Sequence, residues 1–393
     1  MPASMTTVDG LLKEVYALRL EDQLQNETVA IKRIERTTEG VVSTVGGRYV
    51  DFPIRVQRNT GIGYRNENEQ LPNAGQQGYA AVHVPLKYGY GRVRFSGQVM
   101  ELADSNYQAF ASAMDNEMEY LKDDIAKDQN FIVYGDGTGL RATITDSAAS
   151  TSHTVANAQY LEIGMNTDIL VIANGTALIS SNVITDINGT TVTWTTTFTP
   201  TASTHGVYRA GDYAREPTGF GTIIDNAATL HGLAPGTQRK WAAYIDANGG
   251  TNRALSEGLM ISVCDGVRRN GGKTSAVFTS LGVRRAYFNL LTQQRRYVNT
   301  ESFDGGFEGL AFNYGTEIPV VEDVDAPPNR MKFVEEDKIK IFRDKEWHWA
   351  DDDGTVLKWV VDFDAWQAIL RQYSEFGTIQ RNAHGELRDV TEG

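Results

Sequence analysis

An uninterrupted helical pattern in the second hundred residues constrains this chain more than any other feature. No proline or glycine occurs from Ser105 to Tyr134, and Ser105 with Gln108 has the spacing of a capping box. Apolar residues then recur every three or four positions, which places them on one face of an α-helix. These core-face residues are Phe110, Met114, Met118, Leu121 and Ile125. A helix of roughly 45 Å with one narrow apolar stripe predicts a strut within a larger fold.

The helical pattern ends at Gly135-Asp-Gly-Thr-Gly139. Glycine ends helices because it adopts the left-handed conformation without steric cost. A run of glycines also occurs in phosphate-binding loops, but those loops follow a strand and open a helix. Here the glycines follow a helix and lie at its negative end. The pattern therefore indicates a helix end and argues against a phosphate site.

Length, charge and cysteine content limit the classes of protein. A chain of 393 residues predicts two or three domains, and a net charge of −13 argues against a surface that grips nucleic acid. The single Cys264 excludes an intrachain disulfide and a multi-cysteine zinc site, and its helical surroundings predict a small core residue. No signal peptide and no apolar run of ~20 residues is visible. We expect a soluble protein in a reducing compartment.

The first hundred residues suggest an arm and an extended loop. Val8–Leu24 has a helical pattern that fits either a surface helix or an arm packed on a neighbouring subunit. Gly46–Val99 is β-rich on both sides of Asn59–Gly78, a stretch of glycines and asparagines that cannot build its own core. We expect this loop to act between molecules; a solvated hairpin is the alternative. The candidate contact residues are Arg58, Arg65, Glu67 and Glu69.

The composition changes sharply between Ala142 and Thr204. This span contains 16 threonines and no lysine or arginine. Short strand patterns alternate with Asn174-Gly175 and Asn188-Gly189, which are typical turns of β-hairpins. The span predicts a small antiparallel β-module inserted into a larger fold.

From Pro217 onward, helical and strand patterns alternate. Helices are predicted at Arg253–Arg268 and Leu281–Arg295, and strands at Ser275–Thr279, Glu317–Val321 and Arg330–Phe333. Lys338–Trp349 and Thr355–Phe363 are predicted to form a hairpin around Asp351–Gly354, followed by a short helix (Asp364–Tyr373) and a polar tail (Thr378–Val390).

None of these patterns predicts catalysis or a cofactor. The three aspartates of Asp351–Gly354 lack the alternate spacing and distal glutamate of a calcium loop, so a solvated turn is the better interpretation. Trp347-His-Trp349 alternates, which favours two tryptophans on one face of a strand, in a core or an interface. No metalloprotease or serine-hydrolase motif occurs. We expect a protein without enzymatic activity, cofactor or metal.

The order of these segments resembles that of the major capsid proteins of tailed double-stranded-DNA bacteriophages, which have the Hong Kong 97-like fold. The matching features are the arm, the extended loop, the long helix ending in Tyr134-Gly-Asp-Gly-Thr-Gly139, the α/β region and the late strands. Asp362-Phe-Asp-Ala-Trp366, Tyr373-Ser-Glu-Phe376 and Arg381-Asn-Ala-His-Gly385 are similar to actinobacterial-phage members. The inserted β-module is a departure from the minimal fold. Family members that begin with a cleaved scaffold segment of about a hundred residues differ from this chain, whose extended loop starts near residue 46, so we expect a separate scaffolding protein.

The resemblance implies an α+β chain with a defined division into domains. These are an N-terminal arm (1–45), an extended loop (46–99), a peripheral domain with the spine helix (100–141 and 326–363), the inserted β-module (142–213), and an axial domain with the C-terminal tail (214–325 and 364–393).

The function implied is structural. The resemblance predicts self-assembly into pentamers and hexamers of an icosahedral shell around the phage genome, in a virion assembled in the host cytoplasm. It implies a separate scaffolding protein and a portal as partners, and it is compatible with a minor capsid or decoration protein. It also implies that packaged DNA is contacted only non-specifically and that no membrane is involved. Two alternatives remain at this point: an encapsulin-type shell for cargo enzymes, and a β-rich glycan-binding or adhesive protein.

Overall fold

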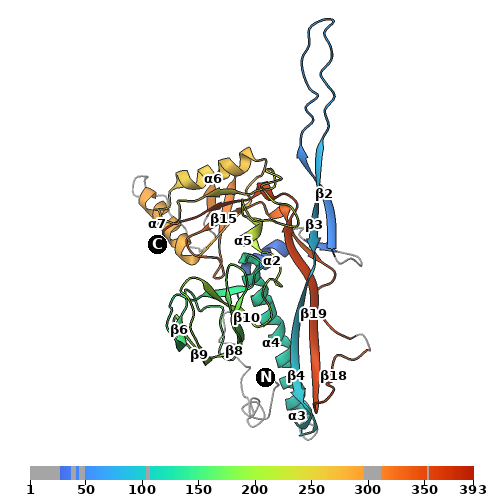
Figure 1. Cartoon of the computed structure of the whole chain (residues 1–393), viewed down its shortest axis with the longest axis vertical. Helices are drawn as coiled ribbons and strands as arrows, with labels where there is room; N and C mark the ends of the chain where they lie inside the picture. The colour runs from blue at the N-terminus through green and yellow to red at the C-terminus, as the bar shows by residue number, and fades with distance from the viewer. Residues whose placement is uncertain (1–26, 37–40, 44–48, 103–106, 296–310, 352–353) are drawn as a thin grey trace. The chain divides into compact units, whose positions relative to one another are not determined.

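A computed structural model describes residues 27–36, 41–43, 49–102, 107–295, 311–351 and 354–393. The chain divides into two compact units (Figure 1). Unit 2 is Gly135–Thr222, and its sequence interrupts that of unit 1, to which the other described residues belong. The helix predicted over Val8–Leu24 lies outside the described residues.

A first sheet of unit 1 is organised around β19 (Ala365–Thr378). Antiparallel to it run β4 (Lys87–Ser96), β16 (Ile339–Arg343), β17 (His348–Trp349) and β18 (Lys358–Trp359), and β1 (Val41–Ser43) is parallel to β16. The β4–β19 pairing runs from Ser96–Ala365 to Lys87–Ser374. Strand β19 therefore joins the early part of the chain to its late part (Figure 1).

The structure corrects the short helix predicted over Asp364–Tyr373. This stretch has apolar residues at helical spacing, but it forms most of β19. Its buried residues alternate at Ala368, Leu370 and Gln372, which is the period of a strand. Pairing with β4, almost 300 residues away in sequence, overrides the local pattern.

The helix α4 (Tyr107–Tyr134) occupies the span of the long helical pattern. The predicted capping residue Ser105 lies outside the described residues, as do the side chains of Phe110 and Met114. Leu121 and Ile125 point at β4, where a methyl group on Gly91 would lie 2.5 Å from Ile125 Cδ1. The glycine lets the helix approach the strand closely. Met118, earlier on the same predicted stripe, is half-buried.

The short helix α2 (Val29–Arg36) is held by side chains from distant parts of unit 1. Asp323, which is buried, accepts hydrogen bonds from the Ala30 amide (3.1 Å) and from Asn130 of α4 (3.1 Å). Lys127 of α4 donates to Asp325 at 2.8 Å. The Ala30 amide is one of the first four of its helix, which have no partner within the helix. The carboxylate of Asp323 thus caps α2 from outside and ties it to α4.

A second sheet of unit 1 has the strand order β11-β20-β15-β12-β14-β13. These strands are β11 (Tyr244–Asp246), β12 (Ala276–Thr279), β13 (Ala311–Asn313), β14 (Glu317–Glu322), β15 (Met331–Val334) and β20 (Gly385–Leu387). The helices α6 (Glu257–Arg269) and α7 (Leu281–Arg295) share a core with the sheet, in which Val263, Tyr287 and Phe333 are almost fully buried. The predicted helices and strands of this region are present within a few residues.

Two predictions for the end of the chain are wrong. The predicted polar tail contains β20, which lies inside the second sheet because it pairs with both β11 and β15. The predicted hairpin around Asp351–Gly354 is absent from the described residues, since β17 and β18 each pair with β19 and not with each other. Short polar strands carry little apolar periodicity, so the sequence gives no strong signal for such pairings.

Unit 2 is a closed β-barrel. Its strands are β5 (Leu140–Thr143), β6 (Ser150–Thr154), β7 (Asn166–Val171), β8 (Ala177–Asn188), β9 (Thr191–Phe198) and β10 (His205–Arg209), in the order β5-β10-β7-β8-β9-β6. The residues that follow β5 pair with those that follow β6 through the Ile144–Val155 bridge, which closes the ring. Trp194 and Val207 lie in the core that fills it. A closed barrel has no free strand edge.

The two ends of the barrel unit meet. The Gly221 amide donates to the Gly135 carbonyl at 2.9 Å, and Ala214 donates to Thr138 at 2.9 Å. Arg141 is buried and forms an ion pair with Glu216. The remaining short elements of the chain are α3 (Gly97–Leu102), α5 (Phe220–Ile223), η2 (Glu336–Lys338) and η3 (Arg381–Ala383).

We predict that the barrel folds alone when its ends are kept. A fragment of residues 135–222 should show a β-type circular dichroism spectrum and a cooperative thermal transition. The fragment 141–215, which the sequence pattern alone suggests, omits Glu216 and leaves the buried Arg141 without that partner, which costs about 3 kcal/mol or more. It should melt at a clearly lower temperature. Equal melting temperatures would contradict the role given to this ion pair.

A buried ion network in the second sheet links stability to pH. Glu386 of β20 is fully buried, 2.8 Å from Lys332 of β15 and next to Arg388. Burial alone would raise the pKa of Glu386, but the cations of Lys332 and Arg388 outweigh it and lower the pKa below 4.5. A carboxylate whose pKa is lower in the folded state contributes stability above its unfolded pKa, and this contribution is lost as pH falls through the folded pKa.

We therefore predict that Glu386→Gln destabilises the protein at pH 7 by about 3 kcal/mol, because Lys332 stays buried without its charge partner. The difference from the wild type should shrink as pH falls below 4.5, where the wild type loses this contribution. Urea unfolding from pH 7 to pH 3 measures both effects. Glu346→Gln is the control, since Glu346 pairs with Arg343 but is 80% exposed, so its loss should cost about 0–1 kcal/mol at every pH.

Candidate assembly surface

The hairpin of β2 (Tyr49–Gln57) and β3 (Gly78–Pro85) exposes alternate residues along both of its strands. The two strands pair antiparallel and form a sheet by themselves. Along β2 every second residue is exposed, and near its root Phe52 stacks on Phe342 of β16 at 5.9 Å. Beyond this contact the hairpin extends away from the first sheet (Figure 1). A two-stranded hairpin is marginally stable by itself in water.

The loop between these strands, residues 58–77, is an irregular two-legged ribbon. Its legs meet at Gly61 and Gly75, where a methyl group on Gly61 would lie 2.7 Å from the Gly75 amide and one on Gly75 would lie 2.6 Å from the Gly61 amide. No side chain fits between the two backbones. Every hydrogen bond that the structure gives to residues 58–77 joins two residues of this loop.

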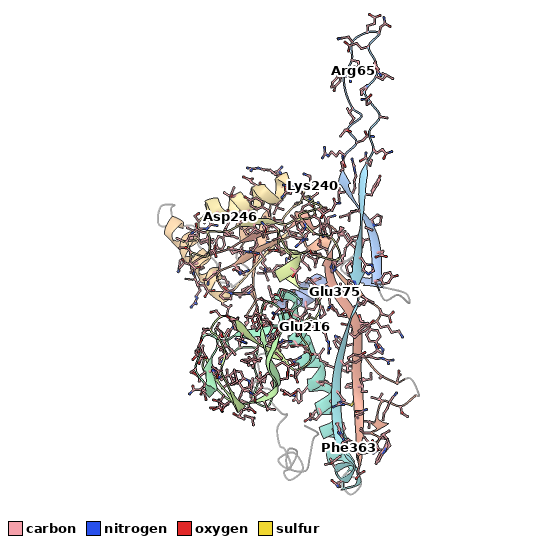
Figure 2. All side chains as sticks on the ribbon, viewed as in Figure 1. Arg65, Glu216, Lys240, Asp246, Phe363 and Glu375 are labelled. Carbon is pink, nitrogen blue, oxygen red and sulfur yellow. The ribbon has the colours of Figure 1, made fainter. Side chains whose placement is uncertain are left out.

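Two of the four predicted contact residues form hydrogen bonds within the loop, and Figure 2 labels one of them, Arg65. Arg65 donates to the Gln70 carbonyl at 2.9 Å and to its neighbour Tyr64 at 3.0 Å. Glu69 accepts from the amide and the side chain of Asn66 at 3.0 and 2.9 Å, and these bonds lower the pKa of Glu69. Arg65 and Glu69 therefore brace the tip itself.

The other two predicted contact residues have no such role. Arg58 and Glu67 are exposed and form no hydrogen bond or ion pair within the part of the chain that the structure describes. Glu67 lies next to Asn68, whose φ of 65° marks the turn at the apex. Their charges are therefore available to another molecule, and contact between subunits through all four residues stays a prediction.

The apolar residues of the loop were not among the predicted contact residues. Ile62, Tyr64 and Leu71 are 84%, 99% and 79% exposed, so the loop presents large apolar side chains as well as charges. Exposed apolar residues gathered on one segment are typical of an interaction surface. The available signal was their position between glycines and asparagines, which cannot supply a core to cover them.

Metal-binding clusters and the single cysteine were considered as candidate sites for chemistry in the described part of the chain. No group of three or more His, Cys, Asp or Glu residues there is placed to hold a metal ion. Cys264 is buried, and burial raises the pKa of its thiol to about 11, so it is unreactive at neutral pH. Among the described helices, none combines the length and the apolar character needed to cross a membrane.

This chain is similar to known capsid proteins, in part of its sequence and in its fold. The SU10 major capsid protein family matches residues 196–348, less than half of the chain. None of the curated proteins compared with this sequence matches it. Among solved structures, a chain of the cyanophage A-1(L) capsid asymmetric unit is similar over 99% of this chain and 100% of that one, with a TM-score of 0.63 and 14% identity. A capsid chain of the native GTA particle is similar over 99% of both chains, with a TM-score of 0.55 and 11% identity.

The fold is that of phage capsid proteins, with mixed α and β structure. Together with the family match, this confirms the resemblance to the major capsid proteins of tailed bacteriophages, and it agrees with the predicted location in the virion capsid.

We predict that Gly61→Val disorders the loop without unfolding unit 1, because a side chain at this position collides with the Gly75 backbone. Amide hydrogen exchange of residues 58–77 should become fast, while the melting temperature stays unchanged. Gly63→Ala is the control, because a methyl group there meets only side-chain atoms of Pro72 and Arg65, at 3.2 Å or more. Equal exchange in the wild type and in Gly61→Val would show that the Gly61–Gly75 approach does not order the loop.

Proposed function

We propose that copies of this protein assemble into pentamers and hexamers, which form an icosahedral shell enclosing the double-stranded DNA genome of a phage. The observation that carries this proposal is the loop of residues 58–77. It is bonded only to itself and exposes Ile62, Tyr64 and Leu71. Such a loop belongs to a surface that a second molecule covers.

The energetics of the loop favour a neighbouring copy as that molecule. Ordering its backbone costs about 1–2 kcal/mol per residue, and hydrogen bonds within the loop recover only part of this cost. Burial of the three exposed side chains contributes about 1.5–3 kcal/mol for each. Arg58 and Glu67 add ion pairs that salt would weaken. Since every copy carries the same loop and the same surfaces, one such contact repeats by symmetry and closes a ring.

The other elements correspond, in this proposal, to the domains expected of a capsid protein. Helix α4 is the spine, the sheet around β19 is the peripheral domain, and the sheet with α6 and α7 is the axial domain. The barrel Gly135–Thr222 is an inserted module. A net charge of −13 suits a wall that does not grip packaged DNA. A scaffolding protein, a portal and minor decoration proteins are the further partners we propose.

The two alternative functions have less support. The similarities found are to capsid proteins of phages and of the GTA particle, and they favour neither an encapsulin-type cargo shell nor a glycan-binding protein. The interior of the barrel is filled by buried side chains such as Trp194, so it offers no space for a glycan.

We predict that replacing residues 58–77 with a short Gly-Ser turn prevents the formation of stable shells. The subunit should keep its circular dichroism spectrum and one cooperative transition, because the loop contributes nothing to the core. Analytical sedimentation and negative-stain microscopy, at low and high salt and with the scaffolding protein where required, should show wild-type shells. The variant should give free subunits or shells that dissociate in salt.

Two further variants sharpen this test. The triple variant Ile62→Ala/Tyr64→Ala/Leu71→Ala removes only the exposed apolar side chains of the loop and should also weaken the shells. Ile163→Ala removes an apolar side chain that is 63% exposed on the barrel and should leave assembly unchanged. Salt-resistant shells from the loop replacement would overturn the interface role, and an unfolded subunit would show that the loop belongs to the core.

A further inference from the structure

A tight turn of unit 1 lies at the root of the hairpin. Leu230 and Leu233 exchange backbone hydrogen bonds of 3.0 Å in both directions. The two residues between them, His231 and Gly232, have φ of 49° and 82°. Two central residues with positive φ are the signature of a type I′ turn. Glycine adopts this conformation without cost, whereas histidine does so with strain.

His231 contacts both the hairpin and the long strand β19. Its carbonyl accepts a hydrogen bond of 3.0 Å from the amide of His83 in β3. On the other side its ring lies against Gly377 of β19, where a methyl group would be 2.7 Å from Nε2 of His231 and 2.9 Å from Phe342. One residue therefore connects the hairpin to the sheet at a point where only a glycine on β19 leaves room for the ring.

This placement costs stability in two ways. The His231 side chain is buried, and its Nε2 has no hydrogen-bond partner among the described residues. Burial lowers the pKa of His231 to about 4; a hydrogen bond of the ring with the Phe376 backbone opposes this shift, whereas the nearby Arg381 and His83 add to it, so the ring is uncharged at neutral pH. A buried unpaired polar atom and a strained backbone both raise the free energy of the folded state. Stability of the core alone does not explain a histidine here.

The direction in which the hairpin β2–β3 leaves the subunit does explain a histidine at position 231. Apart from the turn, the root of the hairpin is held by the buried side chains of Val82 and Val84, by the Phe52–Phe342 stacking and by the chain running on into β4. Apolar contacts are not directional, so they resist tilting less than a hydrogen bond does. Residues 51–67 form one leg and span at most roughly 55 Å when extended, so a tilt of about 10° moves the tip by up to roughly 10 Å. The backbone hydrogen bond at His83, opposite Asp51 in the hairpin register, restricts this freedom.

We propose that His231 is a positioning residue for assembly, because the turn it forms fixes the direction in which the hairpin β2–β3 leaves the subunit. The proposal rests on the proposed function, in which the tip of this hairpin contacts a neighbouring copy. The angle at which each copy reaches the next sets the curvature of a closed assembly. His231 would thereby determine whether shells close with one uniform size.

The direct test measures the hairpin in the unassembled subunit. Spin labels at Gln70→Cys on the loop and Arg269→Cys on α6 report the distance between the tip and the body by pulsed electron spin resonance. The native Cys264 is buried and stays unlabelled. We expect one narrow distance distribution in the otherwise wild-type protein and a distribution broader by about two-fold or more in His231→Gly, which keeps the turn but removes the ring. His231→Asn, which also tolerates positive φ, is the second variant in case the glycine variant fails to fold.

His153→Ala is the matched control, since His153 is a buried histidine of the barrel, bonded to Asp146 and Ser150. It should lower the melting temperature and leave the distance distribution unchanged. In assembly reactions without labels, His231→Gly should give shells of mixed diameter, whereas His153→Ala should not. Equal widths for the wild type and both His231 variants, or a wild type that is already broad, would overturn the proposal. A narrow wild-type distance that broadens in the variants, in a protein that forms no shells, would uphold the positioning role and overturn the proposed function.

Discussion

The pairing of β4 with β19 is the interaction on which the rest of unit 1 depends. It joins Lys87–Ser96 to the start of a strand almost 300 residues later, so the N-terminal and C-terminal parts of the unit fold as one body. Helix α4 lies on this pair because Gly91 leaves room for Leu121 and Ile125. The hairpin leads directly into this pair, since β3 ends at Pro85 and β4 begins at Lys87. A change that separates β4 from β19 would release the helix and the hairpin together.

Buried charged side chains join distant segments of unit 1 at two further points. Asp323 caps α2 and bonds to α4 through Asn130, and Glu386 pairs with Lys332 of β15 and with Arg388, which directly follows β20. Each carboxylate is fully enclosed and has several donors, so removing any one donor leaves a buried group short of partners. These networks therefore favour the observed arrangement of distant segments over arrangements that leave a buried charge unpaired.

Unit 1 is stabilised by contacts within its own chain, whereas the exposed loop has few such contacts. The proposed function depends on this contrast. Unit 1 covers its core with its own chain, whereas residues 58–77 expose apolar side chains and use Arg65 and Glu69 only to brace their own tip. A loop of this kind gains little from its own subunit and most from a second one. A strained turn at His231 is consistent with this division, since it costs the subunit stability and holds the hairpin in one direction.

The sequence by itself determined the local elements: α4, α6, α7, the strands between them, the turns at Asn174-Gly175 and Asn188-Gly189, and the loop with no core of its own. These depend on periodicity and turn residues, which are properties of short stretches. Only the tertiary structure decided that Asp364–Tyr373 is a strand, that β20 lies inside a sheet, and that the strands of unit 2 close into a barrel. Such outcomes depend on partners far away in the chain, whose pairing energy exceeds local preference. The tertiary structure also decided that Arg141 pairs with Glu216 and that the His231 ring lies buried against β19. A charged residue or a histidine in a sequence does not indicate what will surround it.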